Sequence, residues 1–118
     1  MRIRNVSFER WNVELTEPFG IATGAQQLAQ NVLVEVERDD GGRGLGEAAP
    51  FPAVNGETQA NALDALREAA PLLAGFDQAH ALDLPESVRP LLAAAPSALA
   101  AIEMALLDAD CRARGVSM

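Results

Sequence analysis

The stretch from Gly44 to Thr58, GLGEAAPFPAVNGET, decides how the chain is organised. Gly44 and Gly46 stand two apart at what should be the end of a strand, where a missing side chain lets another backbone come close or the strand bend, and a bend is expected. Pro50 and Pro52 then remove two backbone donors, so the strand cannot continue through them. Cap-forming residues follow, just ahead of a helical pattern. The stretch therefore predicts a strand, a short stiff loop and a helix, in that order.

Composition limits the classes of protein that the chain can be. At 118 residues, 49% hydrophobic and 22% charged, it fits one globular domain with a real core. The net charge of -8 argues against a nucleic-acid or anionic-membrane surface, since both need clustered positive charge. The single cysteine, Cys111, cannot form an internal disulfide, and no signal-peptide pattern precedes the first strand. A soluble protein of the reducing cytoplasm is expected.

Three strands are predicted in the first half of the chain. Alternating apolar residues indicate strands over Arg2–Leu15, Leu28–Arg38 and Arg43–Ala48. The segment Thr16–Gln27 contains one proline and two glycines and is predicted to be a loop. Asp39–Gly42, by contrast, is typical of a tight hairpin turn. The order favours an antiparallel meander.

The second half of the chain has a helical period. An amphipathic helix is predicted from about Glu57 to Ala70, with Pro71 ending or kinking it. Short helical pieces are expected over Leu72–Leu92. Pro96 and Ser97 are expected to cap a long helix that runs to Arg114 and stops at Gly115. The predicted fold class is α+β: a three-stranded antiparallel meander followed by a helical half.

The last helix carries two apolar flanks rather than one. They consist of Ile102, Leu106 and Ala109 on one side and of Met104, Leu107 and Cys111 on the other. A helix that lies on a single sheet needs only one apolar stripe. The second flank is therefore expected to be covered, either by other helices of this domain or by something outside it.

Single residues that could carry chemistry are few. His80, the only histidine, has no acid or cysteine at ligand spacing and is expected at the surface. Cys111 is expected to be a small buried hydrophobe. Glu47 is interpreted as a buried carboxylate that ties the loop to a donor, with a place near substrate as the alternative.

Two stretches carry a resemblance to a known family. GLGEAAPFPAVNGET and the run Ala98–Asp108, which follows the pattern A-x-x-A-[IVL]-[DE]-x-A-L-x-D, are similar to the amino-terminal capping domain of the mandelate racemase and muconate lactonizing branch of the enolase superfamily. The chain most resembles the dipeptide epimerases of that branch. The match spans residues 1–118 as a single capping domain, and implies a C-terminal (β/α)8 barrel that these residues do not contain.

The resemblance implies chemistry that lies outside this chain. In the family, the barrel holds Mg²⁺ with three carboxylates, and lysines remove and return the α-proton of the substrate through an enediolate. The nine basic residues here are all arginine, and the carboxylates are scattered. No catalytic residue and no metal ligand is therefore expected in this chain, and the chain alone should be inactive.

The resemblance also implies that two loops close the barrel and choose the substrate. The first is Phe19–Gly24 and the second Phe51–Val54, so the expected pocket wall is made of Phe19, Ile21, Phe51 and Val54, with Thr23 and Gly24 beside it. The alternative is that these side chains form a small core under the loops. Several dipeptide epimerases place an arginine at the position of Thr23 to pair with an acidic substrate. A hydrophobic or small dipeptide is therefore as plausible here as Ala-Glu.

Other functions fit the same residues. Muconate cycloisomerase, o-succinylbenzoate synthase and N-acylamino acid racemase share the fold, and barrel residues decide between them. A different class of function is a stand-alone binding or oligomerisation module. The expected partners are the chain's own barrel, a small carboxylate substrate such as a dipeptide, and further copies of the chain.

Overall fold

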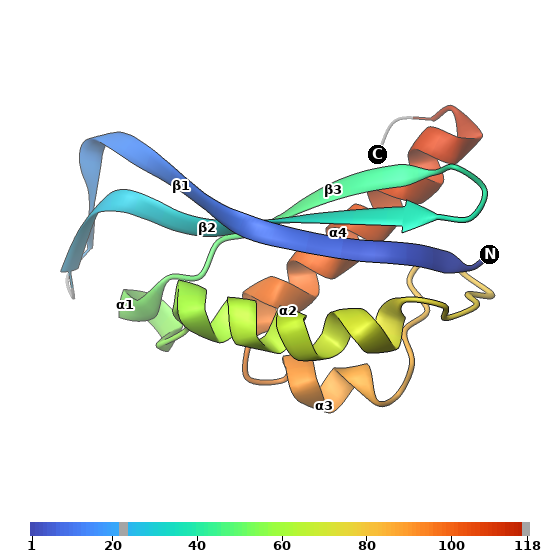
Figure 1. The fold of residues 1–118 in the computed structure, drawn as a ribbon. Helices are drawn as coiled ribbons and strands as arrows, with labels where there is room; N and C mark the ends of the chain where they lie inside the picture. Colours follow the sequence, from blue (N-terminus) through green and yellow to red (C-terminus); the bar gives the residue numbers. More distant parts are fainter. Residues whose placement is uncertain (22–23, 117–118) are drawn as a thin grey trace.

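A computed structural model describes residues 1–21 and 24–116, apart from the side chains of residues 13–29 and of residues 53 and 54. Three strands form one antiparallel sheet in the order β1-β2-β3, and the helices follow (Figure 1). The elements are β1 (Ile3–Ile21), β2 (Gly24–Arg38), β3 (Arg43–Ala48), α1 (Pro52–Asn55), α2 (Gln59–Leu73), α3 (Val88–Leu92) and α4 (Pro96–Arg114). The α+β meander followed by a helical half is confirmed.

The turn between β2 and β3 has the predicted geometry. The Arg38 N–H donates to the Gly42 carbonyl at 2.8 Å, and the Gly41 N–H donates to the Arg38 carbonyl at 3.0 Å. Gly41 has a φ of 88°, a left-handed conformation that favours glycine. The turn sets the register in which Val36 pairs with Gly44 and Val32 with Ala48.

The first two strands are longer than the sequence predicts. The prediction of a loop over Thr16–Gln27 is wrong. The strands β1 and β2 pair as far as Ile21 and Gly24, with Phe19 opposite Gln26 and Ile21 opposite Gly24. The pairing is irregular between Glu14 and Phe19, and the interval includes Pro18. An irregularity of this kind lets a strand carry a proline that a regular ladder would exclude.

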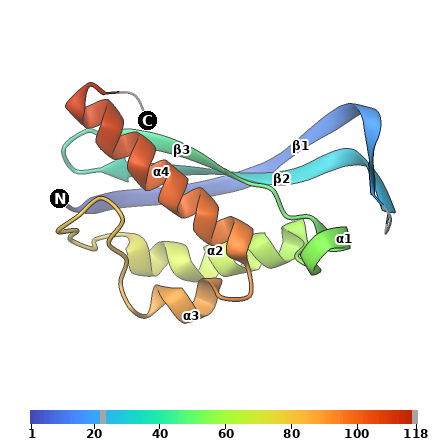
Figure 2. The ribbon, with the colours of Figure 1, turned by 180° about the vertical axis from the view of Figure 1, so that it is seen from behind.

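The helices α2 and α4 cover one face of the sheet, with α3 beneath them (Figures 1 and 2). Val32, Val34 and Val36 on the central strand are fully buried against this layer. Leu66 of α2 and Ile102 of α4 are also fully buried. One core therefore joins the sheet to the helices.

The helix α2 begins later and ends later than predicted. Thr58 is its N-cap and forms a capping box with Asn61. The helix runs through Pro71 to Leu73, so the expected end at Ala70 is wrong. Pro71 lies in the last turn, so only Leu72 and Leu73 of the helix follow it.

The two glycines of β3 allow α4 to lie directly against the sheet. A Cβ atom at Gly44 would overlap the backbone of Ala105 and Ala109, and one at Gly46 would overlap the carbonyl oxygen of Ala101. Of the two roles expected for these glycines, the structure shows the close approach of a second backbone. The predicted end of α4 at Arg114, with Gly115 after it, is confirmed, whereas its N-cap is Ala95 rather than the expected Pro96–Ser97 pair.

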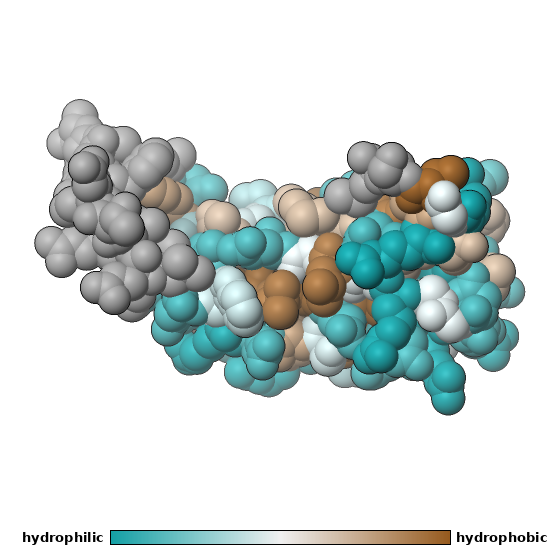
Figure 3. All heavy atoms as spheres, turned by 90° about the horizontal axis from the view of Figure 1, so that it is seen from above, coloured by the Kyte–Doolittle hydropathy of each residue, from teal (hydrophilic) through white to brown (hydrophobic). Residues whose placement is uncertain are grey.

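The opposite face of the sheet carries an apolar area ringed by hydrophilic side chains (Figure 3). Trp11 and Leu45 are 45% and 42% exposed there, and Leu33 lies on the strand between theirs.

The second apolar flank of α4 is covered only in part. Cys111 is buried, whereas Met104 and Leu107 of the same flank are exposed. The domain thus covers Cys111 but leaves Met104 and Leu107 of the second flank open.

Candidate functional site

The residues expected to face the substrate lie at one end of the molecule. Figures 1 and 2 show the β1–β2 hairpin projecting past the helices, with α1 beside its base. Phe19 and Ile21 lie on β1, Gly24 begins β2, and Thr23 falls outside the described residues. The two expected segments therefore share an end of the domain, although the first is a paired hairpin rather than a loop.

The second segment is partly helical. Phe51 is half-buried and directly precedes the single turn of α1, which contains Val54. The turn ends at Gly56, whose φ of 79° is left-handed, and the Asn55 side chain accepts a hydrogen bond from the Glu57 N–H at 3.0 Å. Local bonds therefore give this short connection a defined shape.

Glu57 holds the end of the second segment to α4. Its carboxylate is buried and accepts the Ser97 N–H at 3.1 Å and the Ser97 hydroxyl at 2.6 Å. Ala95, the N-cap of α4, has no side chain for this task. Glu57 thus supplies the cap of a helix 40 residues away in sequence, a role that no local pattern could indicate.

Gln59 joins α2 to the base of the hairpin. Its side chain is buried, donates to the Asn12 side-chain oxygen and to the Asn31 carbonyl, both at 2.8 Å, and accepts from the Arg10 guanidinium at 2.8 Å. All three partners belong to β1 or β2. The sequence gives no sign of this contact beyond a glutamine at the start of a helix.

Charged clusters away from this end hold the sheet to α4. The buried Arg38 guanidinium pairs with Asp40 at 2.6 Å and with Asp110 at 3.0 Å. Its hydrogen bond to Asp40 lowers the pKa of that carboxyl. These contacts join the β2–β3 turn to α4, and their role is structural.

A second carboxylate binds the edge of the sheet. Asp108 accepts the Leu45 N–H at 2.9 Å and pairs with Arg112 at 3.0 Å. The backbone donor of Leu45 is the main cause of the lowered pKa of Asp108, and Arg112 adds to it. Asp108 thus occupies a donor that edge strand β3 would otherwise leave open.

The described residues contain no group of three or more His, Cys, Asp or Glu side chains that could hold a metal ion. His80 is exposed and Cys111 is buried, as predicted.

Glu47 is exposed and accepts a hydrogen bond from the Asn31 side chain at 2.5 Å, so the prediction that Glu47 is a buried carboxylate tying the loop to a donor is wrong. It follows the outward parity of Arg43 and Leu45 on β3. None of the helices among the described residues has the length and hydropathy of a transmembrane span.

Comparisons with known proteins agree on the family. Residues 3–118 match the N-terminal domain of the mandelate racemase / muconate lactonizing enzyme family. An aromatic dipeptide epimerase of Herpetosiphon aurantiacus is 47% identical over 91% of this chain and 30% of its own length. A hydrophobic dipeptide epimerase of Citrifermentans bemidjiense is 41% identical over 86% of this chain and 28% of its own.

A solved structure supports the same grouping. The dipeptide epimerase of Cytophaga hutchinsonii, in complex with Mg and the dipeptide D-Ala-L-Val, superposes with a TM-score of 0.81 at 28% identity. The match covers 94% of this chain and 30% of that one. The chain spans about 30% of the length of such relatives. It belongs to the mandelate racemase and muconate lactonizing enzyme family, as an N-terminal domain of that family.

Proposed function

We propose that this chain is the capping domain of a dipeptide epimerase, and that it closes the active site and selects the substrate. The likeness to an aromatic dipeptide epimerase, at 47% identity over 91% of the chain, is the observation that carries the proposal. The hairpin and α1 lie at the same end of the domain, which suits two walls of one pocket (Figure 1).

The part of this domain in the reaction is to bind and to exclude water. Phe51 and Val54 from the second segment, with Phe19 and Ile21 from the hairpin, would surround the side chains of a dipeptide. Removing water strengthens the electrostatic interactions at the reacting carbon. Contact with the pocket walls holds the substrate in one orientation. The α-proton itself would be moved by groups of the C-terminal part that the relatives carry.

Mg²⁺ is expected in that C-terminal part. When bound, it would stabilise the negative charge that develops on the substrate carboxylate as the α-proton leaves. The domain described here contributes no ligand to it in this proposal.

A neutral dipeptide is the proposed substrate class. Thr23 cannot form the ion pair that an arginine at its position would offer to an acidic side chain. The apolar candidate residues suit an aromatic or aliphatic side chain instead. An acidic dipeptide would have to place a carboxylate among them without a partner.

The test is solvent deuterium uptake by a dipeptide library. The protein that carries this domain with its C-terminal part is incubated with Mg²⁺ in deuterated water, and α-deuterium is measured by mass spectrometry. We expect faster uptake by L-Ala-L-Phe and L-Ala-L-Leu than by L-Ala-L-Glu. Faster uptake by L-Ala-L-Glu would overturn the substrate class, and no uptake by any dipeptide would overturn the proposed function.

A further inference from the structure

The side chain of Gln59 joins helix α2 to both β1 and β2 through three hydrogen bonds. It is 7% exposed and stands at the first position of α2. Its two N–H groups go to Asn12 and Asn31, and its carbonyl oxygen accepts from Arg10. Both donors and the acceptor of the amide are therefore used, which fixes its orientation.

The three partners lie where the hairpin leaves the helical layer. Asn12 pairs with Gln30, and Asn31 pairs with Trp11, in the regular part of the β1–β2 ladder. Beyond this point the ladder continues outward to Ile21 and Gly24 (Figures 1 and 2). Gln59 is thus bonded to both strands at the base of the projecting hairpin.

The same residue is joined through the chain to the second segment. Thr58, next to it, caps α2, and the Asn55 and Gly56 turn precedes that cap. A shift of the Gln59 side chain relative to the strands would therefore change the separation between α1 and the hairpin. The three hydrogen bonds of Gln59 are directional, and its side chain has little freedom to move because it is buried.

We propose that Gln59 is a positioning residue that sets the distance between the two walls of the substrate pocket. This inference rests on the proposed function, since it concerns the fit of a dipeptide between the hairpin and Phe51–Val54. The proposed role of Gln59 concerns substrate binding rather than proton transfer. Substitution of Gln59 should therefore change KM and substrate selectivity and preserve kcat.

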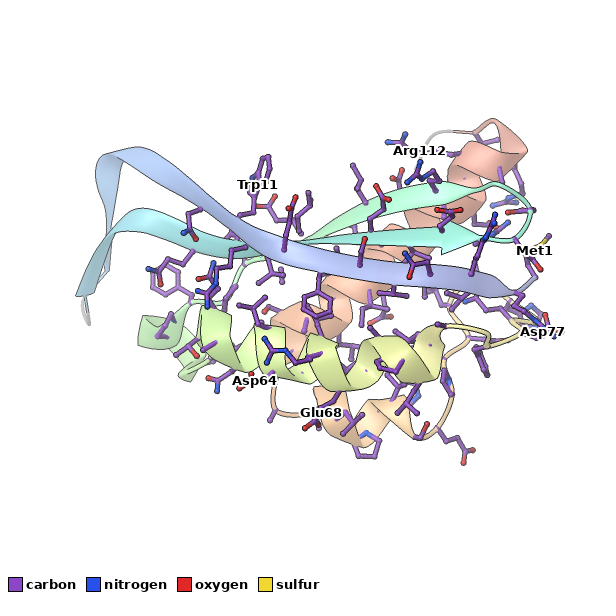
Figure 4. All side chains as sticks on the ribbon, in the orientation of Figure 1. Met1, Trp11, Asp64, Glu68, Asp77 and Arg112 are labelled. Atoms are coloured by element: carbon purple, nitrogen blue, oxygen red, sulfur yellow. The ribbon has the colours of Figure 1, made fainter. Side chains whose placement is uncertain are left out.

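The chain offers a matched control in a second buried glutamine. Gln78 is 5% exposed and donates two bonds, to the carbonyls of Ala81 and Asp83, both at 3.0 Å. It follows Asp77, which Figure 4 shows beside Met1 at the end away from the hairpin. The same substitution there removes a buried amide without touching the hairpin.

The experiment compares Gln59→Leu with Gln78→Leu in the protein that carries this domain with its C-terminal part. For Gln59→Leu we expect KM for L-Ala-L-Phe to rise about tenfold, with kcat within about threefold of the parent. The preference for L-Ala-L-Phe over L-Ala-Gly should fall. Amide hydrogen exchange should become faster in peptides from residues 13–21 and 24–29. Gln78→Leu should leave KM, preference and exchange of those peptides unchanged.

A milder variant guards against loss of folding. Asn12→Ala removes one partner at an exposed position, and should raise KM in the same direction by less than Gln59→Leu. Combined with Gln59→Leu it should add nothing, because Gln59→Leu already removes the bond to Asn12.

The outcomes separate this inference from the proposed function. An unchanged KM and unchanged hairpin exchange in Gln59→Leu would overturn the positioning role, as would equal changes in Gln78→Leu. A parent protein inactive on every dipeptide would overturn the proposed function. Hydrogen exchange would still decide whether Gln59 holds the hairpin.

Discussion

At the scale of single residues, side chains from distant parts of the sequence fix the backbone. Asp108 binds the Leu45 N–H, Glu57 binds Ser97, and Gln59 binds both strands of the hairpin. Each contact satisfies a backbone group that its own element leaves without a partner. Burying such a group without a partner costs free energy, so these polar side chains stabilise the fold.

Asp108→Asn is expected to lower stability in a pH-dependent way. The pKa of Asp108 is lowered in the folded state, so its contribution is present above the unfolded value near 3.8 and is lost as the pH falls through the lower folded value. Near neutral pH the variant should be less stable by about 1 kcal/mol, allowing for solvent screening. Urea unfolding at a series of pH values measures this difference.

The control for that experiment is Asp64→Asn on α2. Asp64 pairs with Arg67, but both side chains are more than 60% exposed, at 71% and 66%. Exposed pairs contribute little, so this variant should match the parent at every pH. A difference between parent and Asp108→Asn that persists unchanged in acid would contradict the assignment.

At the scale of elements, the contact between β3 and α4 depends on the absence of side chains. Gly44 and Gly46 face a row of alanines, and the nearest atoms to their absent side chains are backbone atoms of α4. A helix at this distance from a strand leaves no room for a methyl group.

Gly46→Ala is therefore expected to destabilise the domain by about 3 kcal/mol, because the added carbon overlaps the Ala101 carbonyl and α4 must move. Gly41→Ala is the control: its φ of 88° is unfavourable for alanine, but no atom lies nearby, so about 1 kcal/mol is expected. Chemical denaturation of both variants gives the comparison. Rescue of Gly46→Ala by Ala101→Gly would refute this explanation, since the obstacle is backbone.

Most elements could be predicted from the sequence, and the reasons are local. The β2–β3 turn and the C-terminal end of α4 follow from Asp39–Gly42 and Gly115, which act on their own neighbours. The strand conformation of residues 16–21 and 24–27 could not be predicted, because Pro18 and the glycines there suggest a loop, while the pairing depends on a partner strand. For the same reason Gln59 and Glu57 could not be assigned their partners, which the fold brings together.

The candidate site was predictable only in part. Its location at the end of the domain follows from the two segments that the family resemblance singles out. The side chains that hold those segments in place, Gln59 and Glu57, give no signal in a local pattern. The exposed position of Glu47 could have been found, because it shares the parity of Arg43 and Leu45 along β3.

At the scale of the whole molecule, the proposed function gives the domain surfaces rather than reacting groups. The sequence contains no lysine, and no metal-binding cluster occurs among the described residues. The chain also spans about 30% of the length of the relatives it matches. Proton transfer is therefore expected to depend on the remaining part that such relatives carry.

The 118-residue domain alone should not catalyse deuterium uptake by L-Ala-L-Phe, with or without Mg²⁺. The longer protein is the positive control, and circular dichroism shows whether the isolated domain is folded during the assay. Magnesium-dependent uptake by the isolated domain above the buffer rate would contradict this expectation and place reacting groups within these residues.

The bond between Asp108 and the Leu45 N–H also bears on how the protein is handled. Acid protonates the carboxylate, which releases a backbone donor on an outer strand that another molecule can then pair with. Acid also brings the protein near its pI of about 4.5, where repulsion between molecules is weakest. Low-pH elution from an affinity column would thus take the protein first through its pI and then, at lower pH, to the protonation of Asp108, and a neutral eluent avoids both.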